Sequence, residues 1–308
     1  MEKQKSTWEK EKIELLKELF QAQNKEVNVL ITGATGSGKS STINALFDYE
    51  ISKVGYGVDP ETMNIEKFKL DNLILWDSPG LGDGIKADIR HSKNIINKLI
   101  EKDENGEALI DIVLVIIDGS SRDMGTSYQL INEVIIPNMK DKKRILVAIN
   151  QCDIAMKGKK WNHNLKTPET ELFDFLDDKV KSVEKRIFES TNVEIKPIFY
   201  SASEFYNISK LLHFLIKYTP KEKRAIYINN VNTNRKIWQH NDELEDYNTE
   251  IKKDLIESIQ EGVEKGKMIG GEIGGIFGTV GRKIGGAIGG TIGGLIGAAK
   301  KFLGGIFS

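Results

Sequence analysis

Cysteine and long uncharged runs are both scarce in this sequence. The one cysteine among 308 residues, Cys152, excludes a disulfide within the chain and is typical of a protein in the reducing cytosol. The longest uncharged run, residues 284–299, has 16 residues. As a helix it would cover about 24 Å, which is shorter than a bilayer core of about 30 Å. A standard transmembrane helix is therefore not predicted.

An excess of charge of either sign is also missing. The chain has 44 basic and 45 acidic residues, so no overall nucleic-acid footprint is present and DNA is not an expected partner. The 4 histidines are scattered without metal-ligand spacing, and neither paired catalytic carboxylates nor a Ser-His-Asp arrangement is recognisable. Residues 1–24 are heavily charged, so we expect no signal peptide and a cytoplasmic location.

The most informative feature that is present is a glycine-rich segment at residues 33–40. It reads Gly-Ala-Thr-Gly-Ser-Gly-Lys-Ser, fits the pattern G-x-x-x-x-G-K-S, follows the apolar run 27–32 and precedes a predicted helix. In such a strand, loop and helix, backbone N–H groups surround a β-phosphate, Lys39 brings positive charge to the β- and γ-phosphate oxygens, and Ser40 supplies a hydroxyl ligand to Mg²⁺. A plain Gly/Ser turn is the alternative, and three further segments weigh against it. The predicted phosphate-binding residues are Gly33, Ala34, Thr35, Gly36, Ser37, Gly38, Lys39, Ser40 and Ser41.

The three further segments each follow a predicted strand. Asp77, in Asp-Ser-Pro-Gly, offers a carboxylate beside the metal, and Gly80 offers an N–H to the γ-phosphate. Asp153, in Asn-Gln-Cys-Asp, is placed to accept hydrogen bonds from N1–H and N2–H₂ of guanine, which adenine lacks. The third segment, Ser-Ala-Ser, is expected to place the N–H of Ala202 on guanine O6. Their order and positions are jointly specific, and they add Asp77, Gly80, Asn150, Gln151, Asp153, Ser201 and Ala202 to the predicted nucleotide-binding residues.

Together these segments resemble the G1, G3, G4 and G5 motifs of the translation-factor-related GTPases. Residues 33–44 are similar to the Era-like GTPases carried on bacterial prophages and, more distantly, to the septin, AIG and Toc group. Residues 54–62 and 118–127 also look typical of the prophage-borne family. The resemblance covers about residues 27–219.

The resemblance implies a GTPase that converts GTP to GDP and phosphate with Mg²⁺ as cofactor. Lys39, Thr62 and Gly80 are then the catalytic residues. Ser40, Thr62 and Asp77 are then the metal ligands, and Thr62 is the switch threonine that completes Mg²⁺ coordination when GTP is bound.

Two departures from better-known relatives bear on the mechanism. Gln151 replaces the common lysine of Asn-Lys-x-Asp, and Leu81 follows Gly80 where Ras-like proteins carry the glutamine that orients the attacking water. We therefore expect hydrolysis to be slow, or to be completed by a switch-loop residue, a second copy of the protein or a separate activator. Arg90 and Arg122 are candidates for a residue supplied across a dimer, and each is alternatively a solvated surface residue.

Apolar and polar segments alternate along the chain in a way that predicts an α/β fold. The expected P-loop GTPase domain has a mostly parallel sheet covered by helices, with nucleotide at the carboxyl ends of the strands. An α-helical stalk and a glycine-zipper tail are expected to follow it. The predicted strands are 27–32, 66–70, 73–77, 111–118, 144–150 and 195–200, and the predicted helices are 39–48, 86–102, 123–136, 168–190 and 207–217. The predicted units are an N-terminal amphipathic helix (1–26), the GTPase domain (27–220), a helical linker or stalk (221–261) and the tail (262–308).

Within the stalk, seven apolar residues mark one face of a single long charged helix. They are Ile237, Leu244, Tyr247, Ile251, Leu255, Ile259 and Val263.

In the tail, glycine recurs at a four-residue period. Isoleucines accompany the glycines, so a helix would present a smooth groove beside an apolar ridge. Each glycine costs an aqueous helix about 1 kcal/mol, so a close helix contact or a membrane must compensate. From residue 265 onward six basic residues stand against one acid, which suits anionic lipid head groups.

The sequence as a whole predicts a cytoplasmic GTPase switch, peripheral or conditionally inserted at the inner membrane, whose tail acts on an anionic membrane surface or on other copies of the chain. A homo-oligomer or a nucleotide-dependent dimer is expected. Three alternatives stay open: a ribosome- or RNA-associated assembly GTPase, a scaffold that binds nucleotide without turnover, and a membrane-perforating defence or toxin-like protein. No appended RNA-binding module supports the ribosome as a partner.

Overall fold

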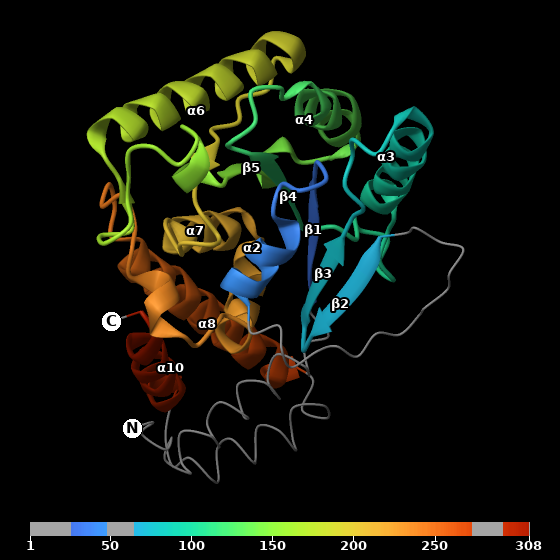
Figure 1. The fold of residues 1–308 in the computed structure, drawn as a ribbon. Coiled ribbons are helices and arrows are strands. Elements are labelled where there is room, and N and C mark those ends of the chain that lie inside the picture. The colour runs from blue at the N-terminus through green and yellow to red at the C-terminus, as the bar shows by residue number, and fades with distance from the viewer. Residues whose placement is uncertain (1–25, 48–64, 273–291, 308) are drawn as a thin grey trace.

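The computed structural model describes residues 26–47, 65–272 and 292–307 and contains a six-stranded sheet with helices on both faces (Figure 1). The strand order is β2-β3-β1-β4-β5-β8, with β2 antiparallel to β3 and every other pair parallel. The strands are β1 (Val27–Gly33), β2 (Glu66–Leu70), β3 (Leu73–Asp77), β4 (Ile112–Asp118), β5 (Ile145–Asn150) and β8 (Ile198–Phe199). This arrangement confirms the predicted α/β fold with a mostly parallel sheet.

The central strands are apolar throughout because helices bury both of their faces. Along β1, Val29 and Ile31 enter one hydrophobic cluster, whereas Leu30 between them enters the other, as the two-residue period of a strand requires. The first cluster lies under α2 (Lys39–Leu46), α7 (Ile208–Tyr218) and α8 (Tyr247–Glu272), and the second under α3 (Ile85–Ile100), η2 (Leu130–Ile135) and α6 (Thr170–Thr191). The remaining elements are α4 (Gly125–Gln129), α5 (Ile136–Asn138), η3 (Lys142–Arg144), η4 (Cys152–Ile154), β6 (Trp161–Asn162), β7 (Thr167–Pro168), η5 (Lys221–Asn229), η6 (Arg235–Trp238) and α10 (Ile292–Ile306).

The strand register brings the predicted motifs to one edge of the sheet. Asp77 at the end of β3 pairs with Ile31 near the end of β1, and Asp118 at the end of β4 pairs with Asn150 at the end of β5. Loops that follow these strands therefore start side by side. Thr62 and residues 1–25 of the predicted N-terminal helix lie outside the described residues.

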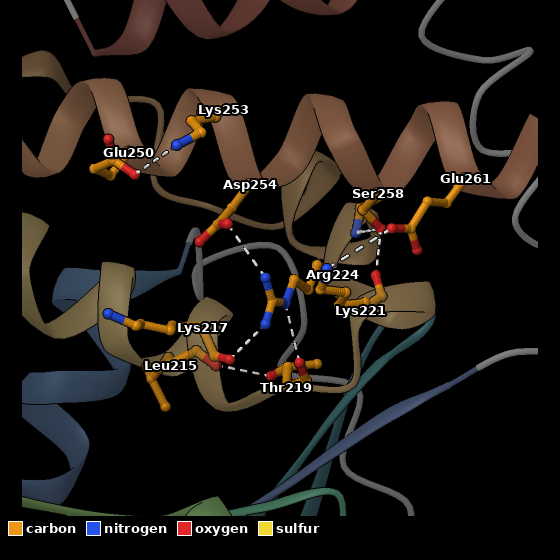
Figure 2. Close-up of polar contacts among 11 residues, drawn as sticks. Leu215, Lys217, Thr219, Lys221, Arg224, Glu250, Lys253, Asp254, Ser258 and Glu261 are labelled. Carbon is orange, nitrogen blue, oxygen red and sulfur yellow. Dashed lines mark hydrogen bonds and ion pairs between the residues drawn. The ribbon is translucent and has the colours of Figure 1, made fainter.

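Residues 221–261 pack against the sheet domain. Figure 2 shows Arg224 of η5 between α7 and α8, where its guanidinium contacts a carboxylate oxygen of Asp254 at 3.2 Å and donates to the carbonyl oxygens of Lys217 at 2.6 Å and Thr219 at 3.1 Å. Apolar residues of α8, among them Leu255, are fully buried in the same cluster as β1. The helical segment thus shares its core with the sheet.

The start of α8 differs from the predicted helical face. Ile237 lies in η6, and Leu244 precedes α8 and is 69% exposed, so including these two residues in the helix was wrong. Asp246 caps the helix by accepting from the N–H of Thr249 at 3.1 Å, and Glu243 has a left-handed φ of 54°, which a continuous helix does not allow.

The last described helix, α10, packs on α8. Leu303 and Phe307 are buried, and the Phe307 ring meets Trp238 edge-on with centroids 5.1 Å apart. No helix of the described residues is long and apolar enough to span a bilayer. Residues 273–291 of the predicted glycine zipper lie outside the described part of the chain.

Replacement of Ser258 by alanine is expected to destabilise this packing. The Ser258 hydroxyl accepts from the Ala225 N–H at 3.0 Å and donates to the Lys221 carbonyl at 2.7 Å, and the side chain is buried. Because Ser258→Ala leaves the buried N–H of Ala225 without a partner, we expect a loss of about 1–3 kcal/mol in the free energy of unfolding, measured by urea denaturation. The control Ser182→Ala, on the exposed face of α6, is expected to change it by less than about 0.5 kcal/mol. Equal effects of Ser258→Ala and Ser182→Ala would contradict the proposed stabilising role of the Ser258 hydrogen bonds.

Candidate functional site

The glycine-rich loop connects β1 to α2 and has the backbone shape of a phosphate cradle. Gly38 caps α2 in the left-handed region, with φ 90°, and a Cβ at this position would collide with the side-chain amide of Asn150. Lys39 is the first residue of α2, and its Nζ donates to the carbonyl oxygens of Ala34 at 3.2 Å and Gly33 at 3.4 Å. The ammonium group therefore lies inside the loop. Ser40 and Ser41 are exposed on the first turn of α2.

Asp77 and Lys39 form the electrostatic centre of the site. Burial lowers the pKa of Lys39, and the neighbouring carboxylates of Asp77 and Asp83 oppose this change. Burial raises the pKa of Asp77 from 3.8 to about 6, with Lys39 lowering the pKa and Glu66 raising it. Each group is thus displaced toward its neutral form, although the two charges attract each other.

The donor set around Asp77 fits Mg²⁺. The Asp77 Oδ1 atom is buried and has no hydrogen-bond partner in the described part of the chain, and the exposed Ser40 hydroxyl lies on the helix that Lys39 begins. Carboxylate and hydroxyl oxygens are ligands that Mg²⁺ prefers. Ser40 and Asp77 can therefore hold Mg²⁺ together with phosphate oxygens, whereas the third predicted ligand, Thr62, is outside the described residues.

The loop after β3 lies directly on the glycine-rich loop. Leu81 donates its N–H to the Gly33 carbonyl at 3.3 Å and accepts from the Thr35 N–H at 2.9 Å, and the Thr35 hydroxyl donates to Asp83 at 3.0 Å. A Cβ on Gly80 would collide with Thr35, so glycine is required for this approach. The Leu81 side chain is only 2% exposed and packs into the hydrophobic cluster of α3. It therefore points into the core and away from the loop surface.

At the other end of the site, Asn150 connects three loops. Its Nδ2 donates to the Ser37 carbonyl at 2.9 Å, and its Oδ1 accepts from the Ala202 N–H at 3.0 Å. Gln151 adds a second link, because its Nε2 donates to the Gly36 carbonyl at 2.9 Å. The Ala202 N–H thus donates to Asn150, and its predicted contact with guanine O6 stays a prediction.

Asp153 and Ser201, the other two residues predicted to lie near the guanine base, have different environments. This part of the site is called the base end below. The Asp153 Oδ1 atom is buried and without a partner among the residues described, so it is an acceptor with unused capacity. Ser201 is fully buried and its hydroxyl accepts from the N–H of Glu204 at 3.1 Å, which fixes the turn of the loop. Asp153 therefore has an acceptor available for a further hydrogen bond, whereas Ser201 holds the turn of its own loop.

Several neighbouring residues were not predicted. Ser120 donates to Gln151 at 3.4 Å and to Asp118 at 2.7 Å, and Lys179 of α6 donates to the carbonyl oxygen of Ser121 at 2.9 Å. His91 of α3 lies 3.0 Å from the Gly80 carbonyl oxygen. Ser120 and Ser121 lie in the segment 118–127 that resembles the prophage-borne family, but their contacts, like those of Lys179 and His91, depend on tertiary packing. The candidate finger residues Arg90 and Arg122 are both exposed.

The raised pKa of Asp77 predicts that the free energy of unfolding depends on pH when the protein is free of Mg²⁺ and nucleotide. The unfolded chain releases this proton near pH 3.8 and the folded chain near pH 6, so folded protein binds more protons between these values and its stability falls as the pH rises. Asp77→Asn removes this loss, and we expect it to be more stable than the parent by about 1–3 kcal/mol at pH 7 and by much less at pH 4.5 in urea denaturation. Asp178→Asn, on exposed α6, is the control without such a difference. An advantage of Asp77→Asn that does not grow with pH would refute the explanation.

Comparisons with known proteins agree with the geometry. Residues 28–151 match the model of a family described as 50S ribosome-binding GTPase. An uncharacterized protein of Methanocaldococcus jannaschii is 26% identical over 209 residues, which cover 64% of this chain and 98% of that protein.

Two solved structures resemble about two thirds of this chain at low sequence identity. A probable GTP-binding protein EngB is 20% identical with a TM-score of 0.38, covering 62% of this chain and 98% of its own. Toc33 from Arabidopsis thaliana, in complex with Mg²⁺ and GMPPNP, is 16% identical with a TM-score of 0.39, covering 65% of this chain and 80% of its own.

Residues 28–151 thus match a GTPase family, and the described residues form an α/β fold with a mostly parallel sheet. The narrower resemblance to prophage-borne Era-like GTPases stays a prediction.

Proposed function

We propose that the protein binds GTP and hydrolyses it to GDP and phosphate as a molecular switch. The observation that carries this proposal is the Asn150 side chain, which joins the phosphate loop at Ser37 to the loop of Ala202 at the base end. The glycine-rich loop and the acceptor at Asp153, three residues after Asn150, are therefore proposed to belong to one site. Guanine supplies two donors to a carboxylate and adenine does not, which supports GTP as the substrate.

Each residue near the phosphates has a proposed role. The backbone of residues 33–38 and Lys39 bind the β- and γ-phosphates, and Ser40, Asp77 and Thr62 hold Mg²⁺, which neutralises charge on the phosphate oxygens. Gly80 presents its N–H to the γ-phosphate. Because Leu81 is buried at the position where Ras-like proteins carry a water-orienting glutamine, hydrolysis by the isolated chain is slow and is accelerated by assembly or by an activator.

The C-terminal helices are proposed to transmit to the tail the conformational difference between the GTP-bound and GDP-bound forms. Helix α8 is held to α7 through Arg224 and Asp254, and α10 packs on α8, so the path from site to tail is continuous. The tail then acts on an anionic membrane surface or on other copies of the chain. Lys300 and Lys301 are exposed on α10 and supply positive charge for lipid head groups.

The description of the matching family favours a second candidate, a GTPase that binds the large ribosomal subunit. Co-sedimentation with ribosomal subunits that depends on GTP would support it over the membrane role. A scaffold without turnover is distinguished by the absence of phosphate release at any protein concentration, whereas an assembly-activated GTPase releases phosphate faster as its concentration rises. A membrane-perforating protein is distinguished by dye leakage from vesicles.

Exchange of Asp153 for asparagine tests the guanine assignment. The new side-chain amide would donate where guanine also donates, so Asp153→Asn is expected to lower GTP affinity about 100-fold and to raise affinity for xanthosine triphosphate, which presents an acceptor at C2. Binding is measured with fluorescent derivatives of both nucleotides. The matched control Asp178→Asn on α6 is expected to leave both affinities unchanged. If Asp153→Asn kept the selectivity of the parent protein for GTP, the proposal that Asp153 recognises guanine would be refuted.

Vesicle flotation tests the membrane role of the tail with the full chain. We expect flotation on anionic vesicles to differ between GDP and a non-hydrolysable GTP analogue, and to fall severalfold in the double variant Lys300→Glu/Lys301→Glu because about 1 kcal/mol of attraction is lost per lysine. Lys181→Glu/Lys185→Glu, on the exposed face of α6, changes the net charge equally and is expected to float like the parent. Absence of flotation in every nucleotide state would favour self-assembly or the ribosome instead.

A further inference from the structure

We propose that His91 is a positioning residue that holds the Gly80 carbonyl, restricts the backbone conformation of Gly80 and its N–H toward the γ-phosphate, and thereby raises the preference of the site for GTP over GDP. The inference rests on the proposed function. It concerns a histidine outside all four sequence motifs, within α3.

His91 makes one defined hydrogen bond. The side chain is 1% exposed, and its Nδ1 atom lies 3.0 Å from the carbonyl oxygen of Gly80. A carbonyl oxygen accepts only, so Nδ1 must carry a proton and donate it. The Nε2 atom is also buried and has no partner in the described part of the chain, so the ring is held on the Gly80 side alone.

The same peptide group is held from its opposite side. The Leu81 N–H, which shares a peptide plane with the Gly80 carbonyl, donates to the Gly33 carbonyl at 3.3 Å. The Leu81 side chain is buried in the cluster that contains Ile95 and Leu99 of α3. Helix α3 and the phosphate loop thus hold one peptide plane at both of its polar ends, and a rotation of that plane would break both hydrogen bonds.

This restraint leaves one group of Gly80 unused. Within the described residues the Gly80 N–H has no hydrogen-bond partner, while the Gly80 Cα lies against the backbone of Thr35 in the phosphate loop. The Gly80 N–H belongs to the preceding peptide group, so the held carbonyl does not fix it directly. The held carbonyl and the close approach of Gly80 to Thr35 together limit rotation about the backbone bonds of Gly80, and so restrict the directions that its N–H can take. A donor held in place before the ligand arrives binds more tightly because less conformational freedom is lost on binding. Only a nucleotide with a γ-phosphate gains from this donor, so His91 acts on GTP and not on GDP.

The test compares two replacements of His91 in the full-length protein. His91→Phe keeps the ring and removes the donor, whereas His91→Asn keeps an N–H donor close to the position of Nδ1. We expect His91→Phe to bind a fluorescent non-hydrolysable GTP analogue about tenfold more weakly with GDP affinity unchanged, and His91→Asn to recover most of the loss. His213→Phe is the matched control. His213 of α7 is as buried as His91, but neither of its ring nitrogens has a hydrogen-bond partner among the described residues, so this replacement removes no hydrogen bond.

The possible outcomes separate the inference from the proposed function. The role of His91 would be overturned if His91→Phe left the ratio of GTP-analogue affinity to GDP affinity unchanged. It would also be overturned if this variant bound the analogue more tightly than the parent does. Failure of the parent protein to bind either nucleotide would instead overturn the proposed function. An NMR spectrum correlating ring protons and nitrogens provides an independent readout, and a His91 ring protonated only at Nε2 would also refute the proposal.

Discussion

The side chain of Asn150 is the constraint on which the candidate site depends. Its two hydrogen bonds, to Ser37 and Ala202, tie together loops that follow three different strands. A buried hydrogen bond contributes only about 1 kcal/mol, but loss of one partner leaves the other unsatisfied at a cost of about 1–3 kcal/mol. The contact also explains Gly38, since any Cβ there would displace the Asn150 amide. One residue at the end of β5 therefore fixes the spacing between the phosphate end and the base end.

On the proposed function, electrostatics explain why a nucleotide and a metal ion would stabilise this arrangement. Burial lowers the pKa of Lys39 and raises the pKa of Asp77, so it favours the uncharged form of each group. The attraction between the two charges opposes this effect but is the weaker of the two. A ligand that brings negative charge to Lys39 and positive charge to Asp77 relieves both costs at once. A phosphate chain with its counter-cation has this distribution of charge, whereas a neutral ligand of the same size does not.

The sequence predicted those parts of the structure that depend on local patterns. The apolar runs of β1, β4 and β5 predicted strands buried on both faces, and the glycine loop with Lys39 predicted the turn into α2. Parallel strands then place Asp77 and Asn150 at one edge without further information.

The parts that depend on tertiary contacts were not predictable. The partner of the Ala202 N–H depends on the distance between two loops, and the role of His91 depends on how α3 packs over Leu81. The start of α8 was misjudged because the apolar period continues through a segment where Asp246 already caps the helix. In each case the residue type was compatible with several contacts, and the fold selected one of them.

The two ends of the site connect to different parts of the molecule. The loop that carries Ala202 leads directly into α7, where Asn207 donates to the carbonyl oxygen of Phe199 at 2.9 Å and accepts from the N–H of Asp242 at 2.8 Å. The fully buried Asp242 carboxylate also contacts Lys210 of α7 at 2.5 Å and the Tyr247 hydroxyl of α8 at 3.0 Å. A buried pair of this kind tolerates little displacement, because separating the charges leaves both uncompensated.

On the proposed function, the base end of the site is therefore rigidly joined to α7, α8 and α10, while the γ-phosphate end is joined to α3 through the loop of Gly80. Occupancy by any guanine nucleotide would act on the C-terminal helices, and the distinction between GTP and GDP would act on α3. A tail that responds to the γ-phosphate then requires the two routes to meet. They meet at the phosphate loop, because Ser37 contacts Asn150 on one side and Thr35 contacts Leu81 on the other. The short backbone stretch from Thr35 to Ser37 thus connects recognition of the base with detection of the γ-phosphate.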